Sequence, residues 1–540
     1  MKINFVSIDG GIIACGFRKM ASLVRSINPE TEINYIVPTN HMSVASFLLG
    51  RCTSDLAFKD IDSISRHLAN ADLVGFSSMT PYAELTKNII KRVKEINPHI
   101  YLIWGGIHPI VNPEDAVNHV DAICVGEGEM AFKEFYSLYK DGLDYTGTKN
   151  FWFNQNGKII KNGFSTLQTK EDMDTLPLPL YAQDPEFIYK KDLGFVPMDS
   201  LEYRNLNGVS YHTVWSIGCP YKCAYCSNSK FIENDPSYRR VRYSSVNHVI
   251  NEIKEVKRKY PFISSVTFHD DSFIGLPMEV LEEFTEEWKK EINISFSVVG
   301  ALPSLVKREK LRILIKAGMY RIKMGIQSGS DRILKFYKRP TTVEITSKAI
   351  AIINEFSPYM IPPTYDIILD NPIETREDVI DTLRFIYDMP RPYNLNVFSL
   401  RIMPNTELEK QLKEMNISHP GINDKNYTLV KPSLANILIF TIDILKPPRA
   451  IFEYLLKFAK PYGEKQPEFP GILFIVRSIY LLKRGFNHLR FLEFSYFPGM
   501  MGKFGYLLVK IGVIRSWHRR VLKKAVAIDL GEPKIEAVLV

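Results

Sequence analysis

The sequence lacks any apolar stretch that is long enough to cross a membrane. Its apolar runs near the C-terminus, such as residues 472–476 and 504–509, are each ended by a charged residue. A membrane-spanning helix needs about 18 or more apolar residues in succession. Residues 1–9 also contain too short an apolar run for the core of a signal peptide, and they lack a small-residue cleavage site. These absences predict a cytoplasmic protein.

Cysteine is also scarce, with six residues in a chain of 540. Three of them, Cys15, Cys52 and Cys124, are far apart in the sequence and show no paired spacing. Isolated cysteines of this kind fit reduced thiols in a reducing compartment. The other three all fall between Cys219 and Cys226, and the interpretation of the chain is organised around them.

The composition is that of a folded protein, with 45% apolar residues, 24% charged residues and a net charge of +8. A chain of this length exceeds one ordinary hydrophobic core, so two or three domains are expected. Changes in the sequence pattern divide it into four predicted segments, at residues 1–145, 146–207, 208–412 and 413–540.

The three clustered cysteines have the spacing Cys-x3-Cys-x2-Cys and follow a strand-like run at residues 211–217. A [4Fe–4S] cube has four irons, so three thiolates leave one iron open to substrate or cofactor. A structural zinc loop normally needs four ligands, and neither a second Cys-x2-Cys nor a His-x-His cluster lies nearby. Three reduced cysteines that are close by chance are the other alternative.

This spacing, with the aromatic Tyr225 before the last cysteine, resembles the signature of the radical S-adenosylmethionine (radical SAM) enzymes. The resemblance implies that Cys219, Cys223 and Cys226 ligate a [4Fe–4S] cluster and that Tyr225 lies near the adenine of SAM. SAM then chelates the fourth iron, and an electron cleaves it to a 5′-deoxyadenosyl radical. An external donor such as flavodoxin or ferredoxin would supply that electron.

The first 140 residues alternate short β-branched runs with amphipathic helical stretches, which predicts a parallel, doubly wound, Rossmann-like (flavodoxin-like) α/β sheet. Such sheets bind ligands beyond the carboxyl ends of their strands. Small, polar and glycine-rich loops follow the predicted strands, with the candidate binding residues Ser77, Ser78, Gly105, Gly106, His108, Gly126, Glu127 and Gly128. Taken alone, these loops could be no more than tight turns.

Together, and upstream of the cysteine motif, the GGxH and GEGE loops resemble the cobalamin-binding domain of the B12-dependent radical SAM enzymes. One departure is that the Asp-x-His-x-x-Gly motif, whose histidine ligates cobalt in many B12 proteins, would fall at residues 9–11, where no histidine stands. The resemblance therefore implies cobalamin without that axial ligand. His108 is either a neighbour of the corrin or a histidine that stabilises its loop.

The segment after this sheet predicts a connector. Residues 151–160 read as a β-hairpin closed by an Asn-Gly turn. Residues 174–181 contain two prolines, which favour an extended strap. Residues 182–210 give little signal beyond a polar loop with scattered aromatic residues.

Six strand-like runs begin near Tyr211, Ser264, Ile294, Tyr320, Thr364 and Asn394, with helices between them. Six βα units resemble the partial (β/α)6 TIM barrel of radical SAM enzymes and are fewer than the eight of a closed barrel. An open barrel leaves a lateral mouth for a large substrate. Polar residues gather at the strand ends, in the stretches 269–273, 324–330, 366–370 and 400–404.

The resemblance covers about residues 211–412 and implies SAM-binding roles for several strand-end residues, namely Asp270, Asp271, Ser297, Gln327, Ser328 and Met403. An alternative for Asp270 and Asp271 is capping of the helix that begins near Met278. The usual Asp-x-Ile-x-Gly-Leu-Pro-Gly-Glu-Thr motif is altered here, because Asp370 and Ile373 replace its two glycines.

The region after Leu412 is predicted to be mostly helical, aromatic and basic. Residues 441–524 contain 16 Lys and Arg against 5 Asp and Glu. These helices either cap the open barrel and line its pocket, or lie on an anionic membrane through a helix such as residues 478–490. A nucleic-acid partner is not expected, because no RNA-binding module follows.

The two implied cofactor domains together predict an enzyme that transfers a methyl group from cobalamin to an unactivated carbon or phosphorus of a small-molecule or lipid-like substrate. A cobalamin-dependent cyclase or rearrangement enzyme without net methylation is the alternative within the family. A non-catalytic iron–sulfur or cobalamin-binding protein is the alternative of another class, but it would have no need of loops that hold SAM.

Overall fold

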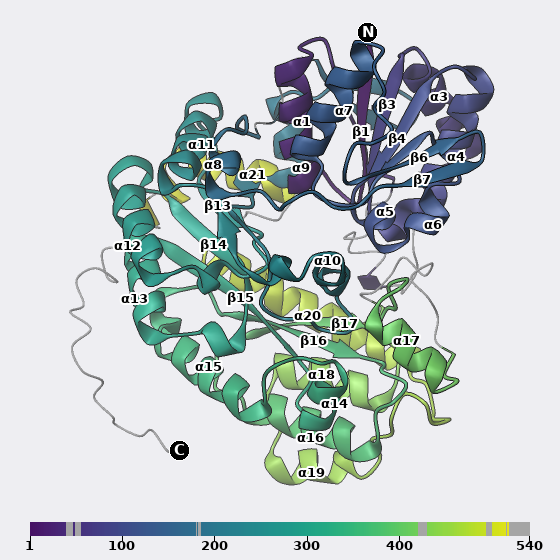
Figure 1. Ribbon diagram of the computed structural model, residues 1–540. Coiled ribbons are helices and arrows are strands. Elements are labelled where there is room, and N and C mark those ends of the chain that lie inside the picture. Colours follow the sequence, from purple (N-terminus) through teal and green to yellow (C-terminus); the bar gives the residue numbers. More distant parts are fainter. Residues whose placement is uncertain are drawn as a thin grey trace.

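The computed structural model describes residues 1–38, 47–48, 56–179, 181, 185–418, 429–492, 499–514 and 516–517. It contains two large sheets, which Figure 1 shows as an upper purple and blue unit and a lower teal and green unit. Both sheets are built mainly from parallel strands with helices packed against them. The predicted α/β fold class is confirmed. Cys52 lies outside the described residues.

The upper sheet has the central strand order β2-β1-β3-β4-β5, which is that of a doubly wound, flavodoxin-like sheet. Its strands are β1 (Ile3–Ile8), β2 (Glu32–Ile36), β3 (Leu73–Ser78), β4 (Tyr101–Gly105) and β5 (Ala122–Cys124). Helices α1 (Cys15–Ile27) and α7 (Glu129–Lys140) pack with one apolar cluster, and α3 (Phe58–Leu68) and α4 (Ala83–Ile96) with another. The carboxyl ends of β3, β4 and β5 point towards the lower unit (Figure 1).

The connector extends this sheet on both edges. The predicted hairpin forms as β6 (Phe151–Gln155) and β7 (Lys158–Lys161). Its first strand, β6, pairs with β5 in antiparallel fashion. The expected polar loop at 182–210 is wrong, because its described part forms β8 (Glu186–Lys190), β9 (Gly194–Pro197) and α9 (Ser200–Asn207). β8 pairs with β2 over Glu186 to Ile188, and this tertiary pairing overrides the weak local pattern.

The lower sheet consists of six parallel strands in sequence order, namely β10 (Ser210–Thr213), β13 (Ser265–Phe268), β14 (Ser295–Ala301), β15 (Met319–Gln327), β16 (Thr364–Leu369) and β17 (Asn394–Ser399). Helices cover its outer face, namely α11 (Val246–Lys259), α12 (Met278–Glu287), α13 (Arg308–Ala317), α15 (Val343–Glu355) and α16 (Arg376–Asp388). Within the described residues, β17 does not pair with β10. The predicted partial barrel is therefore present and open.

The C-terminal region forms the helices α18 (Leu434–Ile444), α19 (Arg449–Leu456), α20 (Pro470–Arg490) and α21 (Gly499–Lys510). Helices α18 and α20 lie beside the last strand of this barrel, whereas α21 packs against α9. The Tyr480 hydroxyl donates a hydrogen bond of 2.6 Å to the carbonyl of Leu395 in β17. Asn487 reaches Asn394 on the same strand at 3.3 Å. The inner side of α20 thus covers the edge of the barrel, as the cap interpretation predicts, and no described helix is long and apolar enough to span a membrane.

Candidate active site

The cysteine loop begins at Gly218, whose φ of +108° and close neighbours allow no side chain. A Cβ there would lie 2.3 Å from the carbonyl oxygen of Arg240. The loop then carries Cys219 and Cys223, both buried, and Cys226, which is partly buried, into one small cluster with Tyr221 and Leu302. The three predicted ligands are therefore brought to one side of the loop.

Burial raises the pKa of the Cys219 and Cys226 thiols to about 12. The nearby Asp271 carboxylate contributes to the rise of both pKa values. Both thiols are consequently neutral in the absence of metal, so iron has to displace their protons when it binds.

The three thiols suit a cluster better than a single ion. Among the described residues, no three His, Cys, Asp or Glu side chains lie close enough together to ligate one metal ion. Tetrahedral zinc needs four ligand atoms around one centre, whereas a [4Fe–4S] cube takes its thiolates on separate irons. Three neighbouring thiols in one apolar loop therefore fit a [4Fe–4S] cube better than a zinc ion.

Arg339 is a buried cation beside this loop that the sequence did not point to. Its guanidinium lies 3.7 Å from the Cys223 sulfur and donates hydrogen bonds to the Tyr225 hydroxyl at 3.1 Å and the Gly325 carbonyl at 2.7 Å. Burial alone would lower the pKa of Arg339, but Tyr225, Cys223 and Tyr221 raise it above its ordinary value. Arg339 therefore stays charged and faces a predicted cluster ligand.

Asp270 and Asp271, which follow β13, have different surroundings. The buried Asp270 carboxylate accepts hydrogen bonds from the backbone N–H groups of Trp215 at 3.0 Å and Ser216 at 2.6 Å, and burial raises its pKa to about 6. Asp271 is exposed and lies near the cysteines. The capping alternative is wrong, because α12 is preceded by Pro277 and has no side-chain cap.

A cavity of about 260 Å³ lies beside Tyr225 on the inner face of the sheet. Of the predicted SAM-binding residues only Tyr225 and Gln327 line it, together with six residues that were not predicted as site residues, namely Asp366, Ile368, Phe398, Ser399, Leu400 and Arg401. Most of these come from β16 and β17, where buried and partly buried residues alternate. This period-two alternation, with Asp366 and Asn396 among the less buried positions, could have pointed to this face of the two strands.

The other predicted SAM-binding residues do not line this cavity. Ser328 is buried and faces Thr382, with 3.2 Å between the two hydroxyl oxygens. Ser297 lies within β14, and its buried hydroxyl has no hydrogen-bond partner among the described residues. Met403 is partly buried in the loop after β17.

A polar network on β15, β16 and β17 lies next to the cavity. Lys323 pairs with Asp366 at 3.0 Å, and Asn396 donates a hydrogen bond to the same carboxylate at 2.9 Å. Arg484 of α20 donates a hydrogen bond to the Asn396 side-chain oxygen at 2.9 Å. The C-terminal region thus contributes to the inner wall of the barrel.

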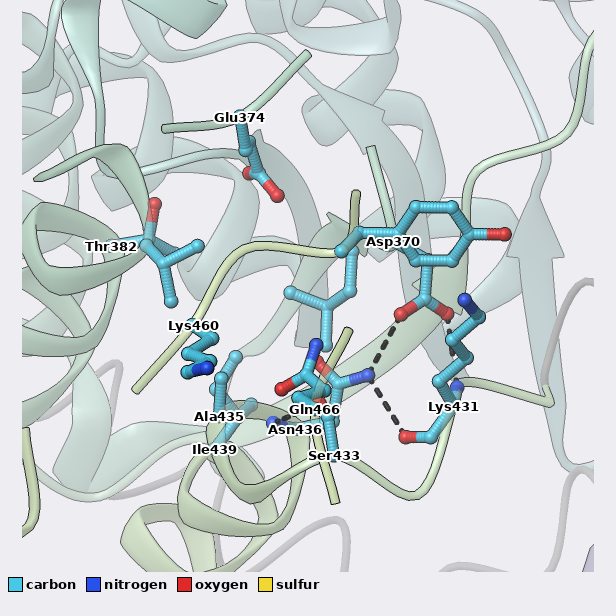
Figure 2. Close-up of a pocket in the computed structure, with 13 residues that line it drawn as sticks. Asp370, Glu374, Thr382, Lys431, Ser433, Ala435, Asn436, Ile439, Lys460 and Gln466 are labelled. Atoms are coloured by element: carbon cyan, nitrogen blue, oxygen red, sulfur yellow. Dashed lines mark hydrogen bonds between the residues drawn. The ribbon is translucent and has the colours of Figure 1, made fainter. Parts of the chain in front are cut away.

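The altered motif after β16 keeps the backbone that a glycine would adopt. Asp370 has a φ of +60°, in the left-handed region that favours glycine. Its carboxylate accepts hydrogen bonds from the Asn436 side chain at 2.8 Å and the Lys431 backbone at 3.1 Å, as Figure 2 shows. Asp370 therefore ties the strand end to the start of α18, which a glycine could not do.

The predicted cobalamin loops lie at the carboxyl ends of β3, β4 and β5. Gly106 has a φ of +91°, and a Cβ there would lie 2.8 Å from the Ser78 carbonyl oxygen. The Ser78 hydroxyl accepts a hydrogen bond from the Trp104 indole at 2.9 Å. Both residues therefore hold the loops of β3 and β4 together, while Gly105 and Ser77 lie side by side on the paired strand ends.

His108 is buried in the turn after β4. Its Nε2 atom lies 2.9 Å from the Asp115 carboxylate, and its ring stacks on Trp104. Burial lowers its pKa below the ordinary value of histidine. Its Nδ1 atom and the Thr80 hydroxyl are buried without a hydrogen-bond partner among the described residues. These two atoms mark this edge of the sheet as one that fits a polar ligand.

The GEGE loop joins the two units. The Glu127 carboxylate forms a two-pronged ion pair with Arg242 of the barrel, at 2.5 and 3.2 Å. A Cβ on Gly126 would lie 2.8 Å from the Asn150 side chain, and one on Gly128 would lie 3.2 Å from the Met20 sulfur. Glu127 therefore bridges the two units, and Gly126 and Gly128 lie where a side chain would crowd their neighbours.

The cobalamin-side loops and the cysteine loop face each other. Helix α5 (Ile107–Val111), in the GGxH loop, contacts α10 (Asn228–Asn234), which follows the cysteines, and both lie at the junction in Figure 1. Asn405, after β17, donates a hydrogen bond of 2.9 Å to the Val111 carbonyl of α5. The carboxyl ends of both sheets are thus directed to the same junction.

Comparison with known proteins agrees with this arrangement. The family model described as the Radical SAM superfamily matches residues 213–386, and that described as the B12 binding domain matches residues 42–136. The chain is a radical SAM enzyme with a B12-binding domain. The matched parts carry the cysteine loop and the glycine-rich loops.

The chain is similar to proteins that are named as methyltransferases and cyclases. An uncharacterized methyltransferase of Pyrococcus horikoshii is 27% identical over 61% of this chain and 67% of its own length. An anaerobic magnesium-protoporphyrin IX monomethyl ester cyclase of Rubrivivax gelatinosus is 25% identical over 60% of this chain and 54% of its own length. The matched regions thus span about half to two thirds of these relatives.

A solved structure shares the fold of this radical SAM enzyme. It is that of TsrM from Kitasatospora setae, a radical S-adenosylmethionine methyltransferase with cobalamin and a [4Fe–4S] cluster bound. The two structures match with a TM-score of 0.57 at 17% identity, over 77% of this chain and 75% of the other. The likeness shows the fold of both units and their order in the chain.

Proposed function

We propose that this radical SAM enzyme holds a [4Fe–4S] cluster on Cys219, Cys223 and Cys226, cleaves SAM reductively, and transfers a methyl group from cobalamin to an unactivated carbon or phosphorus of its substrate. The observation that carries the proposal is the shared junction, to which both the cysteine loop and the B12-side loops are directed. The cluster and SAM supply a carbon-centred radical, and cobalamin supplies the methyl group. Segments 1–145 and 208–412 are proposed as the two cofactor domains, joined by 146–207.

The chain's own residues position the reactants and limit access of water. Tyr225 and Gln327 line the cavity beside the cysteine loop and are proposed to hold SAM. Arg339 forms a hydrogen bond with Tyr225 and places a positive charge near the Cys223 sulfur. A hydrogen bond or charge at a ligating sulfur is one of the means by which a protein adjusts the potential of an iron–sulfur cluster.

A small-molecule substrate is proposed for the inner face of the barrel. The network of Lys323, Asp366 and Asn396 offers a charged pair and an amide beside the cavity, so it can orient a polar group of such a substrate. An external electron donor such as flavodoxin or ferredoxin is proposed as the protein partner. Predicted SAM-binding residues that do not line the cavity, Ser297 and Met403 among them, remain proposals.

Product analysis tests the reaction type. With substrate, reductant and cobalamin, we expect S-adenosylhomocysteine and 5′-deoxyadenosine to accumulate together in equal amounts, because the methyl donor and the radical source are separate SAM molecules. Methyl-deuterated SAM should label the product. Steady 5′-deoxyadenosine formation without S-adenosylhomocysteine would instead favour the cyclase or rearrangement alternative, which the Rubrivivax gelatinosus relative keeps open. A protein that never cleaves SAM would be a non-catalytic binder.

A second prediction concerns the axial ligand of cobalt in the bound corrinoid. Residues 9–11 contain no histidine, and His108 is engaged with Asp115 through Nε2. The electron paramagnetic resonance spectrum of bound cob(II)alamin should therefore show no superhyperfine splitting from an axial nitrogen. The variant His108→Gln should leave that spectrum unchanged. Splitting that is present in the wild type and lost in the variant would show that His108 ligates cobalt.

A further inference from the structure

The side of α20 that faces away from the barrel is apolar over the length of the helix. Its exposed apolar residues, between 42% and 73% accessible, are Ile472, Phe474, Ile475, Ile479, Leu482, Phe486 and Leu489. Most of them recur at intervals of three and four residues, which places them in one stripe. A helix on the surface of a globular protein normally turns such a stripe to the core, so this helix is reversed.

The polar residues of α20 account for the reversal. Tyr480, Arg484 and Asn487 face inward and form hydrogen bonds with Leu395, Asn396 and Asn394 of β17. Leu473 also packs inward, in the hydrophobic core, so the inward side of α20 is mixed and the exposed stripe lies on another side of the helix. The stripe is therefore no part of the barrel's own packing.

Helix α21 continues the same pattern. Phe504, Leu507 and Ile511, at the same three- and four-residue intervals, are between 46% and 61% exposed. The residue that follows the last turn of α20, Leu492, packs in one cluster with Tyr506 and Val509. The end of α20 is thus anchored on the inner side of α21, and the exposed stripes of the two helices together are called the outer face here.

The charge around the outer face indicates which type of partner binds there. Neither α20 nor α21 contains an acidic residue, whereas Arg490, Lys503 and Lys510 are exposed. Residues 441–524 as a whole carry 16 Lys and Arg against 5 Asp and Glu. A second copy of this chain would bring the same positive charge to the contact. An anionic lipid surface supplies the opposite charge and accepts apolar side chains beneath its headgroups.

We propose that the outer face of α20 and α21 docks on the surface of an anionic lipid bilayer. Its Ile, Leu and Phe side chains enter the boundary between headgroups and acyl chains, and Arg490, Lys503 and Lys510 lie at the level of the lipid phosphates. The helices lie along the membrane plane. The docking does not depend on the methyl-transfer reaction, so it stands or falls separately from the proposed function.

Flotation of the full-length protein with vesicles tests this docking without SAM or substrate. The wild type should bind vesicles of phosphatidylcholine mixed with phosphatidylglycerol, and bind pure phosphatidylcholine vesicles far less. The double variant Leu482→Glu/Phe486→Glu should bind on the order of 100-fold more weakly, because two large apolar side chains are withdrawn. Both positions are more than 60% exposed, so the fold should persist. Leu193→Glu, at an equally exposed leucine of the upper sheet, is the matched control and should bind as the wild type.

A second variant separates charge from apolar contact. Lys503→Gln/Lys510→Gln should weaken binding to the anionic vesicles roughly 30-fold and reduce its salt dependence. Equal binding of neutral and anionic vesicles, or wild-type binding by the Leu482→Glu/Phe486→Glu variant, would overturn the proposal. A dimer in solution that the Leu482→Glu/Phe486→Glu variant dissociates would also overturn it, because the outer face would then bind a second copy of the chain. Vesicle binding that requires removal of residues 518–540 would overturn it as well, because the outer face would then bind the chain's own C-terminal segment.

Discussion

Replacement of Cys219, Cys223 or Cys226 with alanine is expected to abolish 5′-deoxyadenosine formation from SAM. Two thiolates cannot retain a [4Fe–4S] cube with one iron open, and no other described cysteine joins the cluster in which these three lie. Activity should fall below detection in each single variant after anaerobic reconstitution. Iron content and the visible absorption of the cluster should fall in parallel.

The control for this experiment is Cys15→Ala. Cys15 starts α1 in the upper unit, and burial raises the pKa of its thiol to about 11, so it is an unreactive thiol outside the cluster that contains the three loop cysteines. This variant should keep its iron and its rate of SAM cleavage. Wild-type cleavage in any of the three loop variants would reject the assignment of the cluster.

The second large effect is expected at Arg18, which joins the two units. It is almost fully buried in α1, and its guanidinium donates hydrogen bonds of 2.7 Å to the His212 carbonyl and the Tyr211 hydroxyl, and another to the Pro179 carbonyl. The same group lies 3.2 Å from the centre of the Tyr181 ring. No sequence motif predicts this contact.

Arg18→Met should lower the free energy of unfolding by about 3 kcal/mol or more. Methionine fills much of the volume of the arginine side chain. The backbone carbonyls of Pro179 and His212 nevertheless remain buried without their charged donor, and methionine cannot replace those hydrogen bonds. The midpoint of unfolding in urea measures the change. Arg258→Met, at an exposed arginine paired with Glu255, should change it by less than about 0.5 kcal/mol. A wild-type midpoint for Arg18→Met would show that the units hold together without this residue.

The chemistry of this protein could be predicted because its decisive residues are neighbours in the chain. The proposed cluster ligands occur within eight residues of sequence, and the glycine-rich loops follow their strands directly, so local spacing alone predicts the cofactors. The alternation of strands and helices likewise predicted both parallel sheets, since each βα unit is formed by adjacent segments.

The departures arose where contacts join distant segments. Residues 182–210 show no strand pattern of their own, and β8 forms because β2 offers it an unpaired edge. Asp370 departs from a glycine motif, yet the backbone keeps its left-handed turn because Asn436 and Lys431 hold the carboxylate.

The sequence by itself determined which cofactors this protein uses and the type of fold that holds them, because those properties are encoded in short motifs and in local periodicity. Only the tertiary structure decided which charges surround the cofactors and which helix faces remain outside. Arg339 is 116 residues from Cys223 in sequence and 3.7 Å from its sulfur. The apolar stripe of α20 likewise stays exposed while another side of the helix is bound to β17, and no helical periodicity can distinguish an inward stripe from an outward one.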